Sequence, residues 1–397
     1  MKLIERPLYM ERLKRVRGTP DIKVITGIRR SGKSKLMEAF EGYVKKTDPM
    51  AHVIHINFNL MEFEKLKDYH DLYDYVESHY EEGKTNYLFI DEVQMCKFFE
   101  KAVNSFHASE KYDIYITGSN AFLLSSDLAT LFTGRTYEIE VFPFSFAEFM
   151  TYYGYENRYE ALKKYMMEGG MAGSYVYQES EDKYRYLSDE VFNALIVRDI
   201  ITKHRIRNQA LLDRISNYLM DIVGNLASVR KITDTLVSKH VKVTDKTVGA
   251  YIDYLCRAYA FYKIRRYDIR GKRYLNTADK YYLADPAFRY ARLGTKNPDF
   301  GHVLENIMAM ELLRRGYEVY VGMLYKKEID FVAMKRDEKI YIQVSDLISD
   351  EKTFEREVSP LLKIQDAYPK MVLARTQLPP YQYEGVQVVD IADWLLK

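Results

Sequence analysis

The fold is decided by the stretch Gly27-Ile28-Arg29-Arg30-Ser31-Gly32-Lys33-Ser34. It fits the pattern G-x-x-x-x-G-K-[ST] at every fixed position, and it directly follows the apolar run Ile22–Thr26. Glycines in this pattern let consecutive backbone N–H groups point at phosphate oxygens, and the start of the next helix adds partial positive charge. The stretch therefore predicts a loop that binds ATP and Mg²⁺, with Lys33 at the β- and γ-phosphates and the Ser34 hydroxyl on the metal.

A second motif completes this predicted site. The apolar run Tyr87-Leu88-Phe89-Ile90 ends in two carboxylates, Asp91 and Glu92. A carboxylate at a strand end holds Mg²⁺ directly or through water, and we expect this role for Asp91. Glu92 is expected to orient or deprotonate the attacking water, the role that separates a nucleotide hydrolase from a nucleotide binder.

Two further contributions to the site are expected. Ile114–Thr117 predicts another buried strand, and Asn120, or Ser119, follows it where a side chain could sense the γ-phosphate; the alternative is an ordinary turn. An arginine is also expected, because the charge of the transition state has to be neutralised from outside the loop. Arg135 is the first candidate and Arg198 the second, and the alternative for either is a surface ion pair.

Apolar runs alternate with amphipathic stretches on both sides of these motifs. Over residues 1–155 the alternation is typical of a parallel sheet covered by helices. We expect strands at Ile22–Thr26, Val53–Phe58, Tyr87–Asp91, Ile114–Thr117 and Tyr137–Val141. Helices are expected at Lys33–Val44, Asp68–Tyr80, Phe98–Ser109 and Ala121–Leu131. A mostly helical part follows over residues 145–225, and the residues beyond 290 return to a mixed α/β pattern.

Composition excludes several other classes of protein. Of the 397 residues 47% are hydrophobic and 29% charged, a balance typical of a folded chain with more than one domain. No apolar run approaches the roughly 20 residues that a membrane span needs, so no membrane partner is expected. The N-terminus lacks the apolar run of a signal peptide, and Cys96 and Cys256 have no partner motif. We therefore expect a cytoplasmic protein.

Positive charge is concentrated in the middle of the chain. Residues 198–275 hold 17 Lys and Arg against 7 Asp and Glu, a balance of +10, whereas the remainder carries −8. Ser228 and Thr244 are each predicted to cap a helix here, and residues 261–274 alternate like a hairpin. Two helices and a hairpin predict a winged helix-turn-helix that binds DNA; the alternative is a module that only docks on the ATPase domain. The expected DNA contacts are Lys246, Thr247, Arg265, Arg266, Arg270, Lys272 and Arg273.

These motifs together resemble those of a known family. The residues that carry the resemblance are Gly27–Ser34, Tyr87–Glu92, Thr117–Asn120, Gly134-Arg135, 141–146, Asp285–Arg289, His302–Asn306, Glu328–Val332 and Tyr341–Ser345. With this set the whole chain resembles prokaryotic AAA-type ATPases that have a C-terminal domain of unknown function. The resemblance implies ATP binding and ATPase activity, and it implies no particular pathway.

The C-terminal part of that family is similar to the PD-(D/E)xK nucleases. In active members of that fold, a helical Glu, an Asp at the start of a strand and a following E-x-K bind Mg²⁺ and activate water. Glu305 matches the first and Asp330 the second, whereas the E-x-K position holds Gln343-Val344-Ser345. Because Gln343 lacks a carboxylate and Ser345 lacks the cation, the resemblance implies a degenerate nuclease site without cleavage.

The predicted architecture is α/β throughout and has three domains. These are a P-loop AAA-type ATPase core over residues 1–155, a helical lid and winged helix over 156–290, and a degenerate nuclease-like domain over 291–397. We expect ATP hydrolysis to be coupled to DNA binding or remodelling, with a second copy of the chain or a DNA-bound partner supplying the arginine. The alternatives are a nucleotide-gated switch that acts on a protein partner, and an ATP-gated nuclease.

Overall fold

The computed structural model describes residues 3–118, 132, 134–294 and 299–397. The chain divides into two compact units, one that ends at Val141 and one that spans Phe142–Lys397. The predicted boundaries differ from this division, because residues 142–155 belong to the second unit and the predicted boundary at residue 290 falls inside it. Both units are of α/β type, as predicted.

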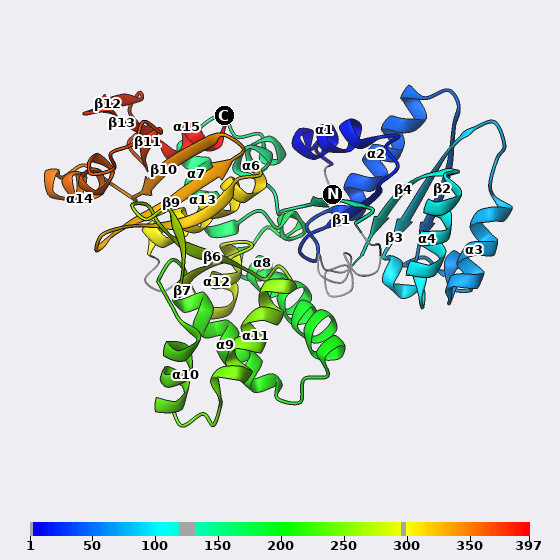
Figure 1. Ribbon diagram of the computed structural model, residues 1–397, viewed down its shortest axis with the longest axis horizontal. Helices are drawn as coiled ribbons and strands as arrows, with labels where there is room; N and C mark the ends of the chain where they lie inside the picture. The colour runs from blue at the N-terminus through cyan, green and yellow to red at the C-terminus, as the bar shows by residue number, and fades with distance from the viewer. Residues whose placement is uncertain (1–2, 119–131, 133, 295–298) are drawn as a thin grey trace. The chain divides into compact units, whose positions relative to one another are not determined.

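Five parallel strands form the core of the N-terminal unit (Figure 1). Their order in the sheet is β2-β3-β4-β1-β5, so that β1 and β3 flank β4. All five predicted strands are confirmed, with ends that differ by at most two residues from those expected. Since every pairing is parallel, all five strands end at the same edge of the sheet. Their bounds are β1 (Ile22–Thr26), β2 (Ala51–Asn57), β3 (Thr85–Asp91), β4 (Tyr112–Thr117) and β5 (Thr136–Glu140).

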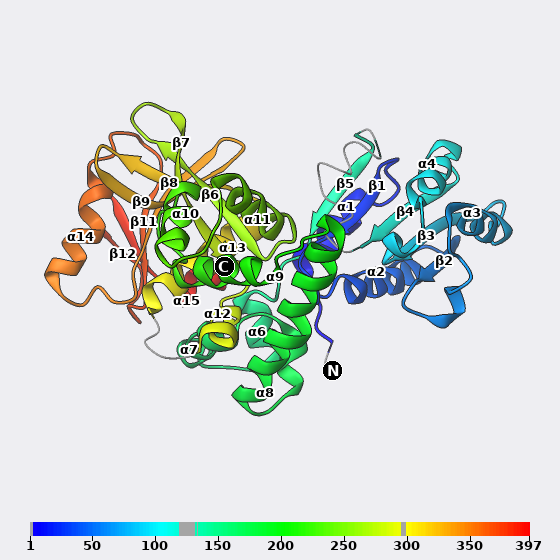
Figure 2. The same ribbon diagram turned by 90° about the horizontal axis from the view of Figure 1, so that it is seen from below.

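Helices cover both faces of this sheet (Figure 2). On one face, α1 and α2 bury an apolar cluster that includes Phe40; on the other, α3 and α4 bury a cluster that includes Phe106. A strand buried on both faces has to be apolar at nearly every position, which explains the continuous apolar runs. The predicted helix at 121–131 lies outside the described residues. The helical bounds are α1 (Pro7–Val16), α2 (Lys33–Thr47), η1 (Met61–Phe63), α3 (Tyr69–Ser78), η2 (Val93–Met95) and α4 (Phe99–Ser109).

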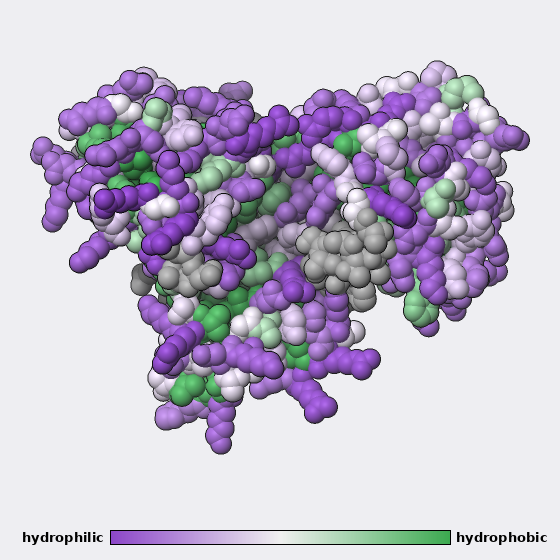
Figure 3. Space-filling model, viewed as in Figure 1, coloured by the Kyte–Doolittle hydropathy of each residue, from purple (hydrophilic) through white to green (hydrophobic). Residues whose placement is uncertain are grey.

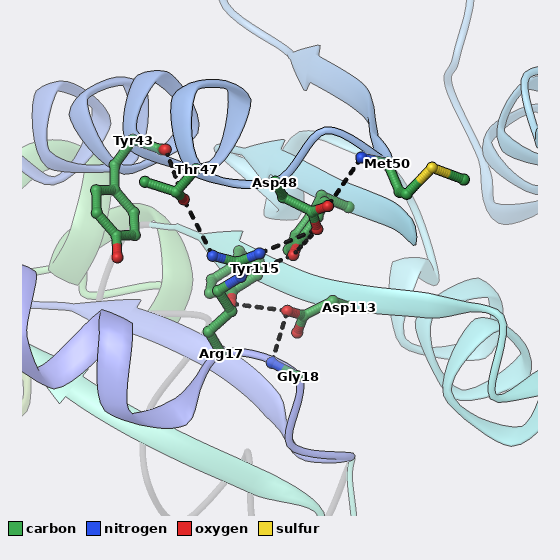
Figure 4. Close-up of polar contacts among 9 residues, drawn as sticks. Arg17, Gly18, Tyr43, Thr47, Asp48, Met50, Asp113 and Tyr115 are labelled. Atoms are coloured by element: carbon green, nitrogen blue, oxygen red, sulfur yellow. Dashed lines mark hydrogen bonds and ion pairs between the residues drawn. The ribbon is translucent and has the colours of Figure 1, made fainter. Parts of the chain in front are cut away.

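A buried ion pair fastens the edge of the sheet where the strands begin. The Lys23 Nζ on β1 lies 2.5 Å from Asp113 Oδ1 on β4, and it also donates to the Thr19 carbonyl oxygen. The Tyr115 hydroxyl and the Gly18 N–H both donate to the second Asp113 oxygen (Figure 4). The Lys23 side chain is fully buried, so its charge depends on this one carboxylate for compensation.

An arginine extends the same polar network to the end of α2 (Figure 4). Arg17 donates to the Tyr87 hydroxyl at 2.8 Å, to the Thr47 hydroxyl at 3.1 Å and to Asp48 Oδ2 at 3.0 Å. The Tyr87 hydroxyl donates in turn to the same Asp48 oxygen at 2.9 Å. These contacts tie α1, the end of α2 and β3 together at the edge opposite to the strand ends.

Replacing Asp113 by Ala should lower the free energy of unfolding of the N-terminal unit by about 3–5 kcal/mol, because a buried ammonium loses its carboxylate. Thermal unfolding followed by circular dichroism measures the loss. Lys35→Ala is the control, since Lys35 pairs with Glu38 on the surface of α2 and such a pair is worth about 0–1 kcal/mol. Equal melting temperatures for the two variants would contradict the assigned role of the buried pair.

The C-terminal unit begins with helices. Two of them start at the predicted caps: the Ser228 hydroxyl accepts from the Lys231 N–H, and the Thr244 hydroxyl accepts from the Thr247 N–H. Before them, η4 and η5 form a wide helix with π-type hydrogen bonding that continues α8. The bounds are α6 (Phe146–Tyr153), α7 (Arg158–Glu168), η3 (Ala172–Val176), α8 (Ser180–Arg185), η4 (Tyr186–Asn193), η5 (Leu195–Thr202), α9 (Gln209–Asp221), α10 (Val229–Ser238) and α11 (Asp245–Arg257).

A mixed sheet of eight strands comes next, in the order β12-β13-β11-β10-β9-β8-β6-β7. Its strands are β6 (Phe261–Asp268), β7 (Arg273–Leu283), β8 (Glu318–Leu324), β9 (Lys327–Lys335), β10 (Glu338–Val344), β11 (Lys370–Ala374), β12 (Tyr381–Tyr383) and β13 (Val386–Asp390). Its helices are α12 (Ala287–Leu293), α13 (Phe300–Arg314), α14 (Glu351–Leu362) and α15 (Ile391–Leu395). No helix among the described residues is long and apolar enough to cross a membrane.

The predicted hairpin is present, but it is not a free wing. β6 pairs with β7 on one side and, in parallel, with β8 on the other, where Arg266–Asp268 lie opposite Val321–Met323. The hairpin and the strands of the part predicted to be nuclease-like therefore share one sheet. The sheet thus continues across the predicted boundary at residue 290, and a pairing between strands so distant in sequence leaves no local pattern.

A buried carboxylate holds the helical part of this unit to the sheet. Asp285 follows β7 and accepts hydrogen bonds from the Gly170 N–H at 2.5 Å and the Ala287 N–H at 2.9 Å. A Cβ at Gly169, whose φ is 64°, would overlap the Asp285 carboxylate, so the close approach requires glycine. Burial raises the pKa of Asp285 to about 7, although both N–H donors act to lower it.

Candidate functional site

The predicted phosphate loop connects the end of β1 to the start of α2. Gly27 has a φ of 125°, and a Cβ there would overlap the Val141 carbonyl oxygen, so only glycine fits beneath the end of β5. Gly32 has a φ of 96° and stands at the N-cap of α2. Glycine at both positions lets the backbone turn sharply without strain, as the motif predicts.

Donors of this loop are available to an anion. Within the described part of the chain, no side chain caps the N-terminus of α2, so its first N–H groups remain without intrahelical partners. The buried Ser31 hydroxyl makes no hydrogen bond to any described residue. Uncapped amides at the start of a 15-residue helix and an unpartnered hydroxyl fit the oxygens of a bound phosphate.

The loop lysine is held in place beside these donors. Lys33 is 7% exposed, and its Nζ donates to the carbonyl oxygens of Gly27 at 2.9 Å and Ile28 at 3.1 Å. In the motif, an ammonium at this position reaches the β- and γ-phosphates of a bound nucleotide. Next to it, Ser34 stands in the first turn of α2, where the motif requires a hydroxyl. In the same loop, Arg29 is half-buried and Arg30 is exposed.

Two strands away, the predicted carboxylate pair lies at the same edge. Asp91 is 1% exposed and accepts a hydrogen bond from the Thr117 hydroxyl of β4. The Thr117 oxygen also accepts from the Glu92 N–H at 3.1 Å. Glu92 has a left-handed backbone with a φ of 57°, and its Oε2 accepts from Gln94 Nε2 at 2.5 Å. Thr117 therefore orients Asp91 and Glu92. The sequence offered a signal for this role, because Thr117 is the last residue of the predicted strand Ile114–Thr117.

The first arginine expected to serve the site is not beside it. Arg135 is exposed directly before β5, and its carbonyl oxygen accepts from the Ile22 N–H at the first residue of β1. The phosphate loop begins after the last residue of β1, about 16 Å away at 3.3 Å per residue. Arg135 thus lies at the wrong edge to reach the loop of its own chain. The second candidate, Arg198, belongs to η5 of the C-terminal unit. Asn120 and Ser119, expected to sense the γ-phosphate, lie outside the described residues.

Sequence reasoning missed the arginine that does contact the loop. Arg6 precedes α1, is 6% exposed, and donates from Nη1 to the Ser31 carbonyl oxygen at 3.0 Å. Its guanidinium lies 4.4 Å from the ring centroid of the fully buried Tyr9. A Cβ added at Gly32 would stand 3.8 Å from Nη1. Arg6 therefore supports the loop from the N-terminal segment. The contact could not be predicted from the sequence, because Arg6 lies 25 residues before its partner Ser31.

Arg6→Ala should weaken ATP binding by about 10-fold, because the hydrogen bond that fixes the loop carbonyl is lost at a cost of roughly 1.5 kcal/mol. Isothermal titration calorimetry with ATP and Mg²⁺ measures the change. Arg15→Ala, on the helix α1 that follows Arg6, serves as the control, since Arg15 is exposed and contacts the Tyr137 hydroxyl instead. If both variants bind ATP like the wild type, Arg6 does not position the loop.

A second group of predicted residues meets in the C-terminal unit. Glu305 of α13, Asp330 of β9 and Gln343 of β10 line a cleft of about 880 Å³ together with Ser345. Gln343 Oε1 accepts from the Asp330 N–H at 3.2 Å, and Asp330 Oδ2 accepts from the Val344 N–H at 2.8 Å. Gln343 and Asp330 therefore brace β9 against β10. Burial, followed by the charge of Glu305, raises the pKa of Asp330 well above its ordinary value.

The cation of this cluster was also missed. Lys280 of β7 is buried, and its Nζ lies 2.6 Å from Glu305 Oε1 and 2.7 Å from Glu328 Oε1. Burial acts to lower the pKa of Lys280, but Glu305, Asp330 and Glu328 raise it above its ordinary value. The sequence Lys280-Tyr281-Tyr282 offered a weak signal, because a lysine next to buried aromatic residues of a strand needs a carboxylate partner.

The residues predicted to contact DNA are spread over α11 and the hairpin. Lys246 is exposed in the first turn of α11, and Thr247 beside it is half-buried. Arg265, Lys272 and Arg273 are exposed, whereas Arg266 is half-buried. Arg273 Nε lies 3.4 Å from Asp268, so part of its charge is already paired.

Comparison with known proteins gives two family matches. Residues 19–150 match a family described as an AAA domain, and residues 159–299 match a domain of unknown function (DUF8612). An uncharacterized protein of Haemophilus influenzae is 35% identical to this chain, over 100% of the chain and 99% of the relative. An uncharacterized protein of Methanocaldococcus jannaschii is 28% identical, over 94% of the chain and 85% of the relative.

Among solved structures, the similarity is weaker. The Walker-type ATPase of Pyrococcus abyssi has 17% identity and a TM-score of 0.47, with 73% of this chain and 96% of that chain covered. The Orc1 protein of Aeropyrum pernix, in complex with DNA, has 13% identity and a TM-score of 0.31, with 73% and 92% covered.

Proposed function

Because this chain belongs to a family of P-loop AAA-type ATPases that carry a second domain of unknown function, we propose that it binds ATP with Mg²⁺ and hydrolyses it. One observation carries the proposal. The phosphate loop after β1 and the carboxylates after β3 lie at the same edge of a parallel sheet, with Thr117 of β4 between them. A nucleotide hydrolase needs both halves within reach of one ligand.

The roles of the residues derive from their chemistry. The uncapped amides of α2 and the Ser31 hydroxyl bind phosphate oxygens, and Lys33 neutralises the β- and γ-phosphates. Ser34 and Asp91 hold Mg²⁺, which when bound neutralises charge on the phosphate oxygens. Thr117 keeps the buried Asp91 carboxylate turned toward the strand edge.

Glu92 is the proposed base of the reaction. It accepts the proton of the attacking water, or orients that water, at the strand end where Gln94 Nε2 holds its carboxylate. Because Arg135 lies at the far edge of the sheet, an arginine that neutralises the transition state has to come from elsewhere. We assign this contribution to a second copy of the chain or to a bound partner, and Asn120, or Ser119, remains the proposed sensor of the γ-phosphate.

Lys33→Ala should weaken ATP binding by about 30- to 150-fold, because a charge-assisted contact worth roughly 2–3 kcal/mol is lost. Glu92→Gln should bind ATP as the wild type does and hydrolyse it about 10²–10⁴-fold more slowly, since a neutral amide cannot take a proton. Calorimetry and a phosphate-release assay measure the two effects. Lys35→Ala, an exposed lysine one residue beyond Ser34, is the control. Unimpaired turnover in Glu92→Gln would remove that residue from catalysis.

We further propose that ATP turnover is coupled to DNA binding through α11 and the hairpin. The support is electrostatic, because residues 198–275 carry +10 and the exposed Lys246, Arg265 and Lys272 belong to that segment. Exposed lysines and arginines bind DNA phosphates by releasing counterions. The hairpin lies at the edge of the sheet, and Arg270, Gly271 and Lys272 in its turn are exposed.

A protein partner is the competing proposal, and one feature favours it. A groove of about 820 Å³ runs along α9–α11 and is lined largely by apolar side chains, namely Leu211, Val237, Val241, Val243 and Tyr251. Val237 is 51% exposed there, and Figure 3 shows hydrophobic side chains among the polar ones in the region of α9 and α10. Such a surface suits a nucleotide-gated switch that binds an apolar segment of another protein.

Charge removal separates these two proposals. Replacing Lys246, Arg265, Lys272 and Arg273 by Ser should weaken binding to duplex DNA and reduce the slope of log K against log salt by about 3.6, since each phosphate contact contributes about 0.9. The half-buried Arg266 is left intact to preserve the fold. An equal-charge control replaces Lys163, Arg185, Lys352 and Lys363, which are exposed elsewhere in the unit. Fluorescence anisotropy over a salt series measures both; equal slopes would leave the protein partner as the better proposal.

A further inference from the structure

The carboxylate cluster of the C-terminal unit is built around an ammonium group. Glu305 comes from α13, Glu328 and Asp330 from β9, and Lys280 from β7. Lys280 Nζ lies 2.6 Å from Glu305, 2.7 Å from Glu328 and 3.9 Å from Asp330. The Tyr282 hydroxyl of the same strand donates to the Glu305 oxygen that faces the lysine. One cation thus stands at the point on which three carboxylates converge.

A divalent metal does not fit this arrangement. The nuclease-like fold implies Mg²⁺ between Glu305 and Asp330, where carboxylate oxygens would bind it at about 2.0–2.1 Å. Glu305 Oε1 is already shared by Lys280 and Tyr282, and Asp330 Oδ2 accepts the Val344 N–H. Gln343 adds no negative charge, because its side chain is a neutral amide. Its Oε1 is also engaged, since it accepts the Asp330 N–H. One oxygen of Glu305 and one of Asp330 are therefore occupied by hydrogen bonds of the fold itself.

Displacing the lysine is opposed by its surroundings. The Lys280 side chain is 3% exposed, so a metal that took its place would leave an ammonium in the interior without its carboxylates. On the same strand, the neighbouring Asp279 carboxylate already pairs with Lys263, and the buried Tyr281 and Tyr282 offer no anion. The tethered cation also has a high effective concentration compared with a free metal ion.

We infer that Lys280 is an internal cation that replaces the divalent metal in this nuclease-like site and keeps the site metal-free. The cleft of about 880 Å³ retains its shape because Lys280 holds α13, β7 and β9 together through the carboxylates. Hydrolysis of a phosphodiester by a metal-bound water is excluded at this site, because Lys280 takes up the carboxylates that would hold the metal. The cleft remains open to ligands, with Lys327, Arg356 and His302 on its walls.

Metal titration of the nucleotide-free full-length chain tests this inference. Mn²⁺ binding is measured by electron paramagnetic resonance for the wild type, Lys280→Ala, Lys280→Arg and the double variant Lys280→Ala/Asp330→Asn. Lys280→Ala should gain one Mn²⁺ site, with at least a 10-fold lower Kd than the wild type, and the double variant should lose it. Lys280→Arg keeps the cation and should bind as the wild type does. The control is Lys263→Ala on the neighbouring strand, since Lys263 pairs with Asp279 and is 43% exposed.

Two results would overturn the inference. One is a Mn²⁺ site in the wild type that disappears in Asp330→Asn, because the lysine would then not exclude the metal. The other is a folded Lys280→Ala that binds no additional Mn²⁺, because the carboxylates would then form no cation site. Should Lys280→Ala fail to fold, Mn²⁺ binding is compared between the wild type and Asp330→Asn. A site present in the wild type and absent in Asp330→Asn would still overturn the inference. Cleavage of DNA or RNA with Mg²⁺ or Mn²⁺ that is lost in Asp330→Asn would equally overturn it.

Discussion

The direction of the strands in the N-terminal unit is the constraint on which the rest depends. Since β1, β3, β4 and β5 all run in parallel, the residues after β1 and β3 meet at one edge, and the residues before β4 and β5 meet at the other. The phosphate loop and Asp91–Glu92 therefore share the first edge, whereas the Lys23–Asp113 pair fastens the second. A sheet held rigidly at its far edge can present the loop and the carboxylates at fixed separation.

Strands, helix caps and the phosphate loop could be predicted from the sequence, because residues within or next to each element determine its structure. Strands buried on both faces have to be apolar throughout, so all five were found within two residues, and the hydroxyls of Ser228 and Thr244 marked two helix starts correctly. The fixed spacing of Gly27, Gly32 and Lys33 predicted the loop because its turn has to be closed by glycine. These features need no knowledge of the remaining chain.

Contacts between distant segments leave no such pattern. The pairing of β6 with β8 depends on residues far apart in the sequence, and without it the hairpin resembles an independent wing. Arg135 follows the predicted γ-phosphate sensor, Asn120, closely in the sequence. Separation along the chain, however, does not reveal at which edge of the sheet a residue lies. Arg6 and Lys280 escape prediction for the same reason, since each acts on a partner at least 25 residues away. In the nuclease-like site, the absent lysine of the motif suggests loss of a charge, whereas the fold supplies a cation from another strand.

The shared strand β6 has a mechanical consequence. Helices α10 and α11 lead directly into β6, and β6 is hydrogen-bonded along its other side to β8 of the C-terminal half of the sheet. Sliding the helix pair against that half would require a row of backbone hydrogen bonds to break together, which thermal motion rarely achieves. The helix pair α10–α11 and the cleft are thus connected through the same sheet. A displacement of α11 is therefore expected to be transmitted through β6 and β8 to the cleft.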